Sequence, residues 1–343
     1  MKSKMPNSFP CRRRPTIGVC APQRRISIPR LLSHAFCFPR FLLLLSCLVC
    51  LPSPASAASP DQQIRASYAR LDAAYSRRDV PAIMACLAPD FKRVTWNAVL
   101  TPTQFQAELT DEFDGTSSAA ATTRLKSLNI HGDTADAVVI RRLDWTYPKP
   151  SPLLLPPYFQ VWVTQDEWRN DQGHWQMTEM ADTPLVQTLS LLNDRDQGIR
   201  NSYFANRKNH AIIAQMGQVD AADRARLKQI IRQYGWPGFD LLGTDGESEA
   251  FEVVQHSDDD KAFQKRCLPL IEAAVKQGQA MPNDAAYLID RVCTGEHKPQ
   301  VYGTQWNVPI ENPAHVDERR ASVGLGPLAE YQKMLNPIYQ PKP

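Results

Sequence analysis

The chain has 343 residues, of which 43% are hydrophobic, and it carries 39 basic and 36 acidic side chains. This length is sufficient for about two globular domains. Nine basic residues and no acidic residue lie in residues 1–57, so the rest of the chain has 30 basic and 36 acidic side chains. Because this remainder is acidic overall, the composition argues against nucleic acid as a partner held by a basic surface.

A short apolar stretch near the N-terminus has the layout of a secretory signal peptide. Phe41 to Leu51 is rich in leucine, follows Arg40 and ends at Pro52, and Ala55-Ser56-Ala57 supplies the small residues that signal peptidases accept. We therefore expect residues 1–57 to be a signal peptide that is removed when the protein becomes periplasmic or secreted. Beyond it, no apolar run reaches the roughly 20 residues that cross a membrane, so we expect no membrane span in the mature chain.

The cysteines leave two questions open. Five of the eight fall in this leader, and Leu44-Leu45-Ser46-Cys47 is similar to a bacterial lipobox, so a lipid anchor is the alternative to a cleaved peptide. Cys86, Cys267 and Cys293 remain. An oxidising compartment permits one disulfide, for which Cys267 and Cys293 are the favoured pair. Three buried thiols are the alternative, because free cysteine packs as a small hydrophobic residue.

The first part of the mature chain has helical periodicity. Apolar residues recur at helical spacing from Ile64 to Tyr75, which predicts an amphipathic helix. Asp79 is placed as the N-cap of a second, short helix over Val80–Leu87. Thr101-Pro102 has the pattern of the start of a third helix. Three helices are therefore expected before Gly115.

After these helices the pattern changes to strands. Ala137–Tyr147 and Tyr158–Arg169 are rich in β-branched and aromatic residues, and a turn at Asp171-Gln172 is expected to lead into a strand over His174–Asp182. Helices followed by an antiparallel sheet predict an α+β domain. Leu185–Leu192 is interpreted as a short connecting segment, for which a helical conformation is one option.

The order of these elements, over residues 60–185, resembles the nuclear transport factor 2-like superfamily in its SnoaL-like branch. The resemblance implies a cone-shaped, cystatin-like α+β sheet domain that closes over a pocket. It rests on three stretches: Ile64 to Tyr75, Arg78-Asp79-Val80-Pro81-Ala82-Ile83, and Leu87-Ala88-Pro89-Asp90-Phe91.

The ketosteroid isomerases of that superfamily provide a test at the level of residues. Ungapped counting from Asp79 places their general-base aspartate near Thr95 and their oxyanion-donating tyrosine near Leu71. Neither side chain can perform that chemistry, so the resemblance does not imply steroid isomerisation.

Aromatic and polar side chains are candidates for the lining of the implied pocket. With the expected turn, Trp168 lies opposite Trp175 on one face of the hairpin. Large aromatic side chains with a few polar groups are typical of sites for a small apolar ligand. Packing within the sheet core is the alternative for each tryptophan. The predicted ligand-binding residues are Tyr68, Trp96, Arg142, Trp162 and, from the second half, Tyr302.

The second half, residues 193–337, is predicted to be a mainly α-helical domain. Asp220 is placed as the N-cap of a helix that Gly235 ends. Asp258-Asp259-Asp260 precede a helix that runs to Gln277. Acids at this position favour the helix dipole, and a metal site is the alternative interpretation. We predict no metal and no cofactor.

This half resembles a bacterial domain of unknown function, family 6624. The resemblance spans about 140 residues and implies an α-rich domain without an established activity. The segments that carry it occur in the expected order: Tyr234-Gly235-Trp236-Pro237, Gln255-His256, Ala286 to Arg291, Gln300 to Gln305, and Arg319-Arg320.

Four residues of these segments form the predicted catalytic set. His256 is the candidate base, Asp290 a carboxylate partner, Arg291 an anion holder and Gln305 an amide donor, which would suffice for a hydrolase. Structural ion pairs are the alternative. The chain contains no nucleophile motif such as G-x-S-x-G. The sequence therefore favours a small-ligand-binding or accessory protein, with the hydrolase as second hypothesis, and it indicates no oligomeric state.

Overall fold

The structure is a computed structural model that describes residues 16–17, 58–148, 152–153 and 155–339. The predicted signal peptide, with its lipobox-like segment, lies outside the described residues apart from the short strand β1 (Thr16–Ile17). None of the helices among the described residues has the length and apolar character needed to span a membrane.

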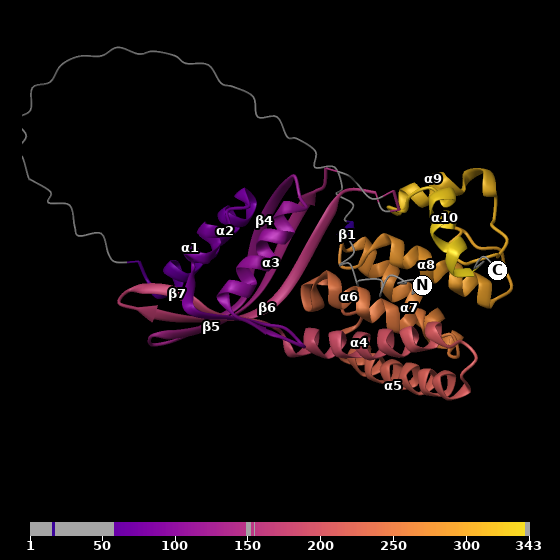
Figure 1. Cartoon of the computed structure of the whole chain (residues 1–343), viewed down its shortest axis with the longest axis horizontal. Coiled ribbons are helices and arrows are strands. Elements are labelled where there is room, and N and C mark those ends of the chain that lie inside the picture. Colours follow the sequence, from indigo (N-terminus) through magenta and orange to yellow (C-terminus); the bar gives the residue numbers. More distant parts are fainter. Residues whose placement is uncertain (1–15, 18–57, 149–151, 154, 340–343) are drawn as a thin grey trace, which may run out of the picture.

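The first half is an α+β arrangement, as predicted, with three helices against a twisted sheet (Figure 1). The helices are α1 (Pro60–Arg77), α2 (Val80–Met84) and α3 (Pro102–Asp114). The strands are β2 (Leu87–Val94), β3 (Val99–Leu100), β4 (Ser118–His131), β5 (Thr134–Thr146), β6 (Tyr158–Asp171) and β7 (His174–Asp182). The order across the sheet is β3-β2-β7-β6-β5-β4, with β1 paired to β6, and only β2 and β7 are parallel.

Local signals explain where these helices begin. Ser59 caps α1 and Thr101 caps α3, each in a capping box with the glutamine three residues later. Asp79 caps α2, where its carboxylate accepts a hydrogen bond from the backbone N–H of Ala82. A proline in the first turn of each helix adds a fixed φ at a position that needs no N–H donor.

The register of the last hairpin differs from the prediction. Trp168 pairs with Met177 rather than with Trp175, because the turn lies at Gln172-Gly173; a bulge between Glu167 and Trp168 then shifts the pairs further from the turn. Both turn residues have positive φ, as a tight hairpin turn requires. The bulge shifts every pair on one side of it by one residue.

The second half is mainly α-helical, as predicted. Two long helices form an antiparallel pair beside the shorter ones (Figure 1). The helices are α4 (Pro184–Ala205), α5 (His210–Tyr234), α6 (Phe239–Gln255), α7 (Lys261–Lys276), α8 (Pro282–Gly295), η1 (Pro313–His315), α9 (Val316–Ser322) and α10 (Leu328–Tyr339).

Two expectations about the helix pair are corrected. The segment Leu185–Leu192 is helical, which was one option, but it is not a short connection, because it forms the first turns of the 22-residue helix α4. Asp220 is not a helix cap. It lies inside α5, which is capped by Asn209. Asp220 instead accepts a hydrogen bond from Arg200 of α4 at 2.9 Å, so its charge stabilises the helix pair rather than a helix end.

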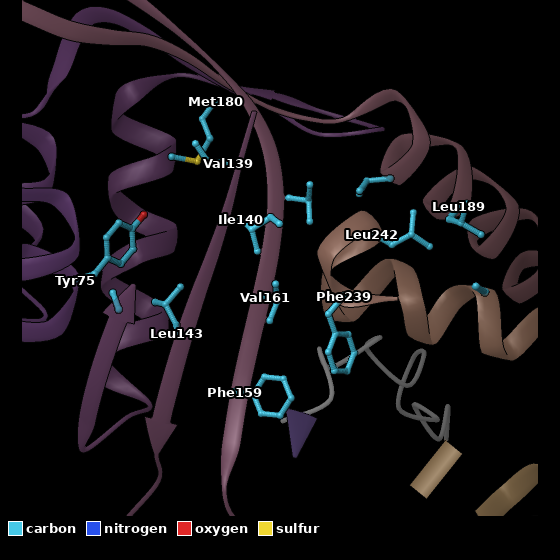
Figure 2. Packing of buried hydrophobic residues seen from close by; sticks show 14 of the residues in the cluster. Tyr75, Val139, Ile140, Leu143, Phe159, Val161, Met180, Leu189, Phe239 and Leu242 are labelled. Atoms are coloured by element: carbon cyan, nitrogen blue, oxygen red, sulfur yellow. The ribbon is translucent and has the colours of Figure 1, made fainter. Parts of the chain in front are cut away.

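The sheet is buried on its inner face and, along the first part of β6, on its outer face as well. Its inner face is directed towards α1 and α3, and its outer face packs against α6 of the second half (Figure 2). Phe159 contacts the ring of Phe239 edge-on at 5.6 Å, and the hydroxyl of Thr244 accepts a hydrogen bond from the backbone N–H of Val161 at 3.2 Å. The buried hydrophobic residues of the two halves therefore form one continuous core.

Cys86, Cys267 and Cys293 are free thiols. The favoured disulfide between Cys267 and Cys293 is therefore not formed, and the alternative of three buried thiols holds only for Cys267. Cys267 is buried in α7, whereas the other two are only partly buried. Burial raises the pKa of the Cys267 thiol to about 12.

Candidate functional site

A buried polar cluster occupies the interior between the inner face of the sheet and α1. It consists of Tyr68, Arg141, Thr164, Asp166 and Met180, each with at most 3% of its surface exposed. The Tyr68 hydroxyl donates to Asp166 at 2.9 Å, and the Thr164 hydroxyl donates to the same carboxylate at 2.7 Å. Asp166 therefore stands at the centre of the cluster.

Arg141 is held near this carboxylate without a close ion pair. Its Nη2 lies 3.9 Å from Asp166 and has no hydrogen-bond partner among the described residues. Its Nη1 donates to the Met180 sulfur at 3.6 Å, and its Nε donates to the Thr123 hydroxyl at 3.2 Å. A thioether is a weak acceptor, so this buried guanidinium is incompletely satisfied.

Burial dominates the electrostatics of the cluster. It raises the pKa of Asp166 against the opposing effects of Arg141 and two hydroxyl donors. Burial, reinforced by the Asp166 charge, raises the pKa of Tyr68 well above its usual value. The Tyr68 hydroxyl is therefore a neutral donor throughout the physiological range.

Aromatic rings surround the polar cluster. Tyr68 contacts Trp168 edge-on at 5.0 Å, and the Trp168 indole donates to the Tyr68 hydroxyl at 3.0 Å. Tyr75 contacts Trp162 at 6.5 Å, and the Arg141 guanidinium lies over the Tyr75 ring at 5.7 Å. Aromatic rings around a few convergent polar groups are also the composition that small-molecule sites have.

The structure brings only two of the five predicted ligand-binding residues into this interior, namely Tyr68 and Trp162. Arg142 lies on the outer face, where it stacks on Phe159 at 4.0 Å and pairs with Asp144 at 2.7 Å. Trp96 lies in the turn between β2 and β3, and Tyr302 lies in the second half.

Arg141 and Asp166 were missed by the sequence reasoning, although a signal exists. Apolar residues occupy alternate positions along β5 on either side of Arg141, including Val139 and Leu143. Strand periodicity therefore places Arg141 on the buried face and its neighbour Arg142 on the opposite face. An arginine in such a pattern indicates a buried charge with a specific partner.

The predicted catalytic set does not assemble as expected. His256 ends α6, and its Nδ1 lies 3.0 Å from the carboxylate of Asp196 on α4, not beside Asp290. Asp196 also pairs with Arg200 at 2.9 Å, and Gln197 donates to it at 3.0 Å. His256 therefore belongs to a polar network that joins α4, α5 and α6.

Asp290 has a structural role. It is fully buried and accepts backbone N–H bonds from Val301, Tyr302 and Thr304 at 2.6 to 2.9 Å, with a fourth bond from the Thr304 hydroxyl. Four donors leave this carboxylate little capacity for another partner. Asp290 thus anchors the loop that follows α8.

Arg291 and Gln305 also have local partners. Arg291 pairs with Asp258 at 2.6 Å, and this pairing contributes to a lowering of the Asp258 pKa to about 2. The Gln305 amide donates to the Thr304 hydroxyl at 3.2 Å. The structure therefore keeps His256 and Arg291 apart from Asp290, whereas Gln305 is linked to Asp290 through the shared Thr304 hydroxyl.

The three acids before α7 are individually satisfied. Asp258 pairs with Lys261, Asp259 with Arg224, and Asp260 caps the helix through the backbone N–H of Phe263. Among the described residues, no group of three or more His, Cys, Asp or Glu side chains is placed to hold a metal ion. The helix-start interpretation therefore accounts for Asp260, whereas Asp258 and Asp259 are held by ion pairs.

The second half of the chain matches a sequence family of unknown function. Residues 183–342 match a sequence family described as "Family of unknown function (DUF6624)", as the resemblance implied. No curated protein matches the chain.

Solved structures give weak likenesses. A conserved protein from Planctomyces limnophilus is 15% identical, with a TM-score of 0.32, 36% of this chain covered and 93% of that chain. A putative dehydratase from the NTF2-like family of Streptomyces avermitilis is 16% identical, with a TM-score of 0.31 and coverages of 36% and 96%. An NTF2-like protein from Cytophaga hutchinsonii is 14% identical, with a TM-score of 0.29 and coverages of 36% and 97%. These TM-scores are low, so the α+β assignment rests on the sheet and helices themselves.

Proposed function

We propose that this protein is an exported small-ligand-binding or accessory protein, and that its first half is a SnoaL-like cone that binds a small, mainly apolar molecule. The buried guanidinium of Arg141, surrounded by aromatic rings and lacking a full set of acceptors, is the observation that carries this proposal. A carbonyl or carboxylate oxygen of a ligand at this position would accept a hydrogen bond from the unpaired Nη2 of Arg141.

The energetics of buried donors support this proposal. A buried donor without a partner costs about 1–3 kcal/mol, and more when the donor is charged. A ligand oxygen that accepts from Nη2 of Arg141 would recover part of this cost, which gives binding a polar specificity element. The Met180 side chain is unbranched and makes only a weak bond to Arg141, so a change of its rotamer within the core would admit the ligand.

The experiment uses two neighbouring arginines. Native mass spectrometry of the purified chain, followed by solvent extraction, would identify a small molecule that the protein retains. Arg141→Met removes the inner guanidinium, whereas Arg142→Met removes the same charge from the outer face and is the matched control. We expect the retained mass in the parent and in Arg142→Met, and its loss in Arg141→Met.

Two results would contradict the ligand proposal. One is the absence of any retained molecule from the parent. The other is equal retention in both arginine variants, which would place the ligand elsewhere. Because a buried charge change can prevent folding, circular dichroism accompanies each sample, and Arg141→Lys, which keeps the charge, replaces the methionine variant if that variant is unfolded.

Export is the second part of the proposal, and it rests on the sequence pattern of residues 1–57. Intact-mass analysis of the protein from its native host tests it directly. We expect a mature chain that begins at Ala58 or Ser59. A product that still carries the leader would exclude a cleaved signal peptide, and a mass that includes diacylglycerol would favour the lipid anchor instead.

A further inference from the structure

A groove lies on the outside of the first half, away from the buried polar cluster. It has a volume of about 410 Å³ and runs between the first turns of α1 and the start of β7. Ser67 and Arg70 of α1 form one wall, and His174 and Trp175 of β7 form the other, with Cys86 at its base. This volume lies within the range of about 300–1,000 Å³ that is usual for small-molecule sites.

The lining of this groove carries positive charge without a compensating acid. None of its lining residues is an aspartate or a glutamate. The Arg70 guanidinium donates to the Ser67 hydroxyl at 2.8 Å, and it makes no ion pair with a carboxylate among the described residues. The nearby Arg65 differs, since Asp61 neutralises it at 2.7 Å. Arg70 therefore presents to solvent, at the edge of the groove, a positive charge that no carboxylate of the described residues pairs with.

We infer that this groove binds a small organic anion, with Arg70 as the charge partner, glutamine side chains of the lining as further donors, and Trp175 with neighbouring alanines as the apolar contact. The inference is independent of the ligand proposed for the cone interior, because the two sites share no side chain. Arginine suits this role, since its planar guanidinium matches a carboxylate or sulfonate in geometry.

Cys86 is a built-in reporter of the groove. Burial raises the pKa of its thiol, and the charge of Arg70 opposes this effect. Cys293 is a second partly buried thiol in the same chain, and burial together with Asp290 raises its pKa. Alkylation of Cys86 should respond to an anion in the groove, whereas alkylation of Cys293 should not.

The test measures the rate at which neutral iodoacetamide alkylates each thiol, and peptide mass spectrometry separates the two thiols. The rates are measured in the presence of two candidate ligands, the probes, which have the same shape. The first probe is 1-naphthoate, an anion, and the second is 1-naphthamide, its neutral counterpart. By mass action we expect naphthoate at twice its Kd to slow the labelling of Cys86 about threefold. The labelling of Cys293 should not change, and naphthamide should give little protection.

Two variants make the result specific. Arg70→Gln should abolish the protection by naphthoate, whereas Arg65→Gln, which removes one positive charge from the same helix outside the groove, should retain it. For each variant, the labelling rate of Cys86 with probe is compared with the rate without probe, because Arg70 also affects the pKa of the Cys86 thiol. Equal protection by both probes, protection that persists in Arg70→Gln, or no protection of the parent would each overturn the inference.

Discussion

At the scale of single residues, the first half contains a buried arginine and a buried aspartate that do not form a close ion pair. Arg141 and Asp166 are both fully buried, yet their closest atoms are 3.9 Å apart. Such pairs add little stability compared with apolar residues of the same size, but removal of one partner leaves the other charge uncompensated. The pair therefore favours one arrangement of the interior.

Substitution of one partner should show this asymmetry. Asp166→Ala should lower the free energy of unfolding by about 3–5 kcal/mol, because Arg141 then remains buried without a carboxylate. The double variant Arg141→Met/Asp166→Leu should recover most of this loss. Urea unfolding measures both. A loss below about 1 kcal/mol for the single variant would show that the two charges do not depend on each other.

Glu249 gives a pH dependence with a definite sign. It accepts a hydrogen bond from Ser190 at 3.1 Å, and burial followed by the charge of Asp245 raises its pKa from 4.5 to about 8. A folded pKa above the unfolded value means that the protonated form contributes stability below about pH 4.5, and that this contribution is lost as the pH rises towards 8.

Glu249→Gln should remove this dependence, because the amide stays neutral. We expect the variant and the parent to be about equally stable near pH 5, and the variant to be the more stable near pH 8. Urea unfolding at several pH values is the measurement. Glu108→Gln, at an exposed position of α3, is the control and should follow the parent. Parallel curves for Glu249→Gln and the parent would contradict the pKa shift.

At the scale of elements, helix starts were predictable where a capping side chain precedes a proline. Asp79 and Thr101 were placed correctly for this reason. Asp220 was placed wrongly, because an acid before small residues has the same pattern, whereas its ion pair with Arg200 forms only in the folded chain. Asn209, the actual cap, is followed by neither a proline in the first turn nor a capping-box partner.

The energetic value of a cap can be separated from its sequence pattern. Thr101→Ala removes the capping box of α3 and should cost about 1 kcal/mol of stability. Thr183 occupies the same N-cap position in α4 but makes no side-chain capping bond, so Thr183→Ala should cost only a few tenths of a kcal/mol. Thermal unfolding compares the two. Equal losses would show that the capping bond of Thr101 contributes nothing.

The candidate site was less predictable than the elements for a physical reason. The α+β order follows from local periodicity, but the neighbours of Tyr68 depend on strand register, which the bulge before Trp168 determines. The partner of His256 was also missed, since Asp196 lies 60 residues away on another helix. Contacts of this kind are set by tertiary packing, which a single sequence does not display.

At the scale of the whole molecule, Gly243 is one of the points at which the two halves approach each other closely. Gly243 interrupts α6 with a φ of 72°, and its lack of a side chain lets the helix approach the backbone of β6. A Cβ at this position would overlap the carbonyl oxygen of Val161. The close approach of α6 to β6 at this point therefore requires a residue without a Cβ atom.

Gly243→Ala should therefore destabilise both halves together. We expect a loss of about 2 kcal/mol or more, from the positive φ and the steric overlap combined. Gly217 lies within α5 with open space around it, so Gly217→Ala should instead stabilise by about 0.5–1 kcal/mol. Hydrogen exchange measured peptide by peptide should rise in both β5 and α7 of the Gly243 variant. A rise confined to one half would mean that the halves unfold separately.

The covered outer face of the sheet limits how this protein can be dissected. Phe159, Val161 and Val163 are all at least 95% buried in the intact chain. A fragment cut after β7 would expose this apolar strip to water, and strips of this kind drive self-association. Oligomers or aggregates of such a fragment would then report the missing cover rather than a native assembly, so the ligand chemistry of each half is best studied by point substitution in the uncut polypeptide.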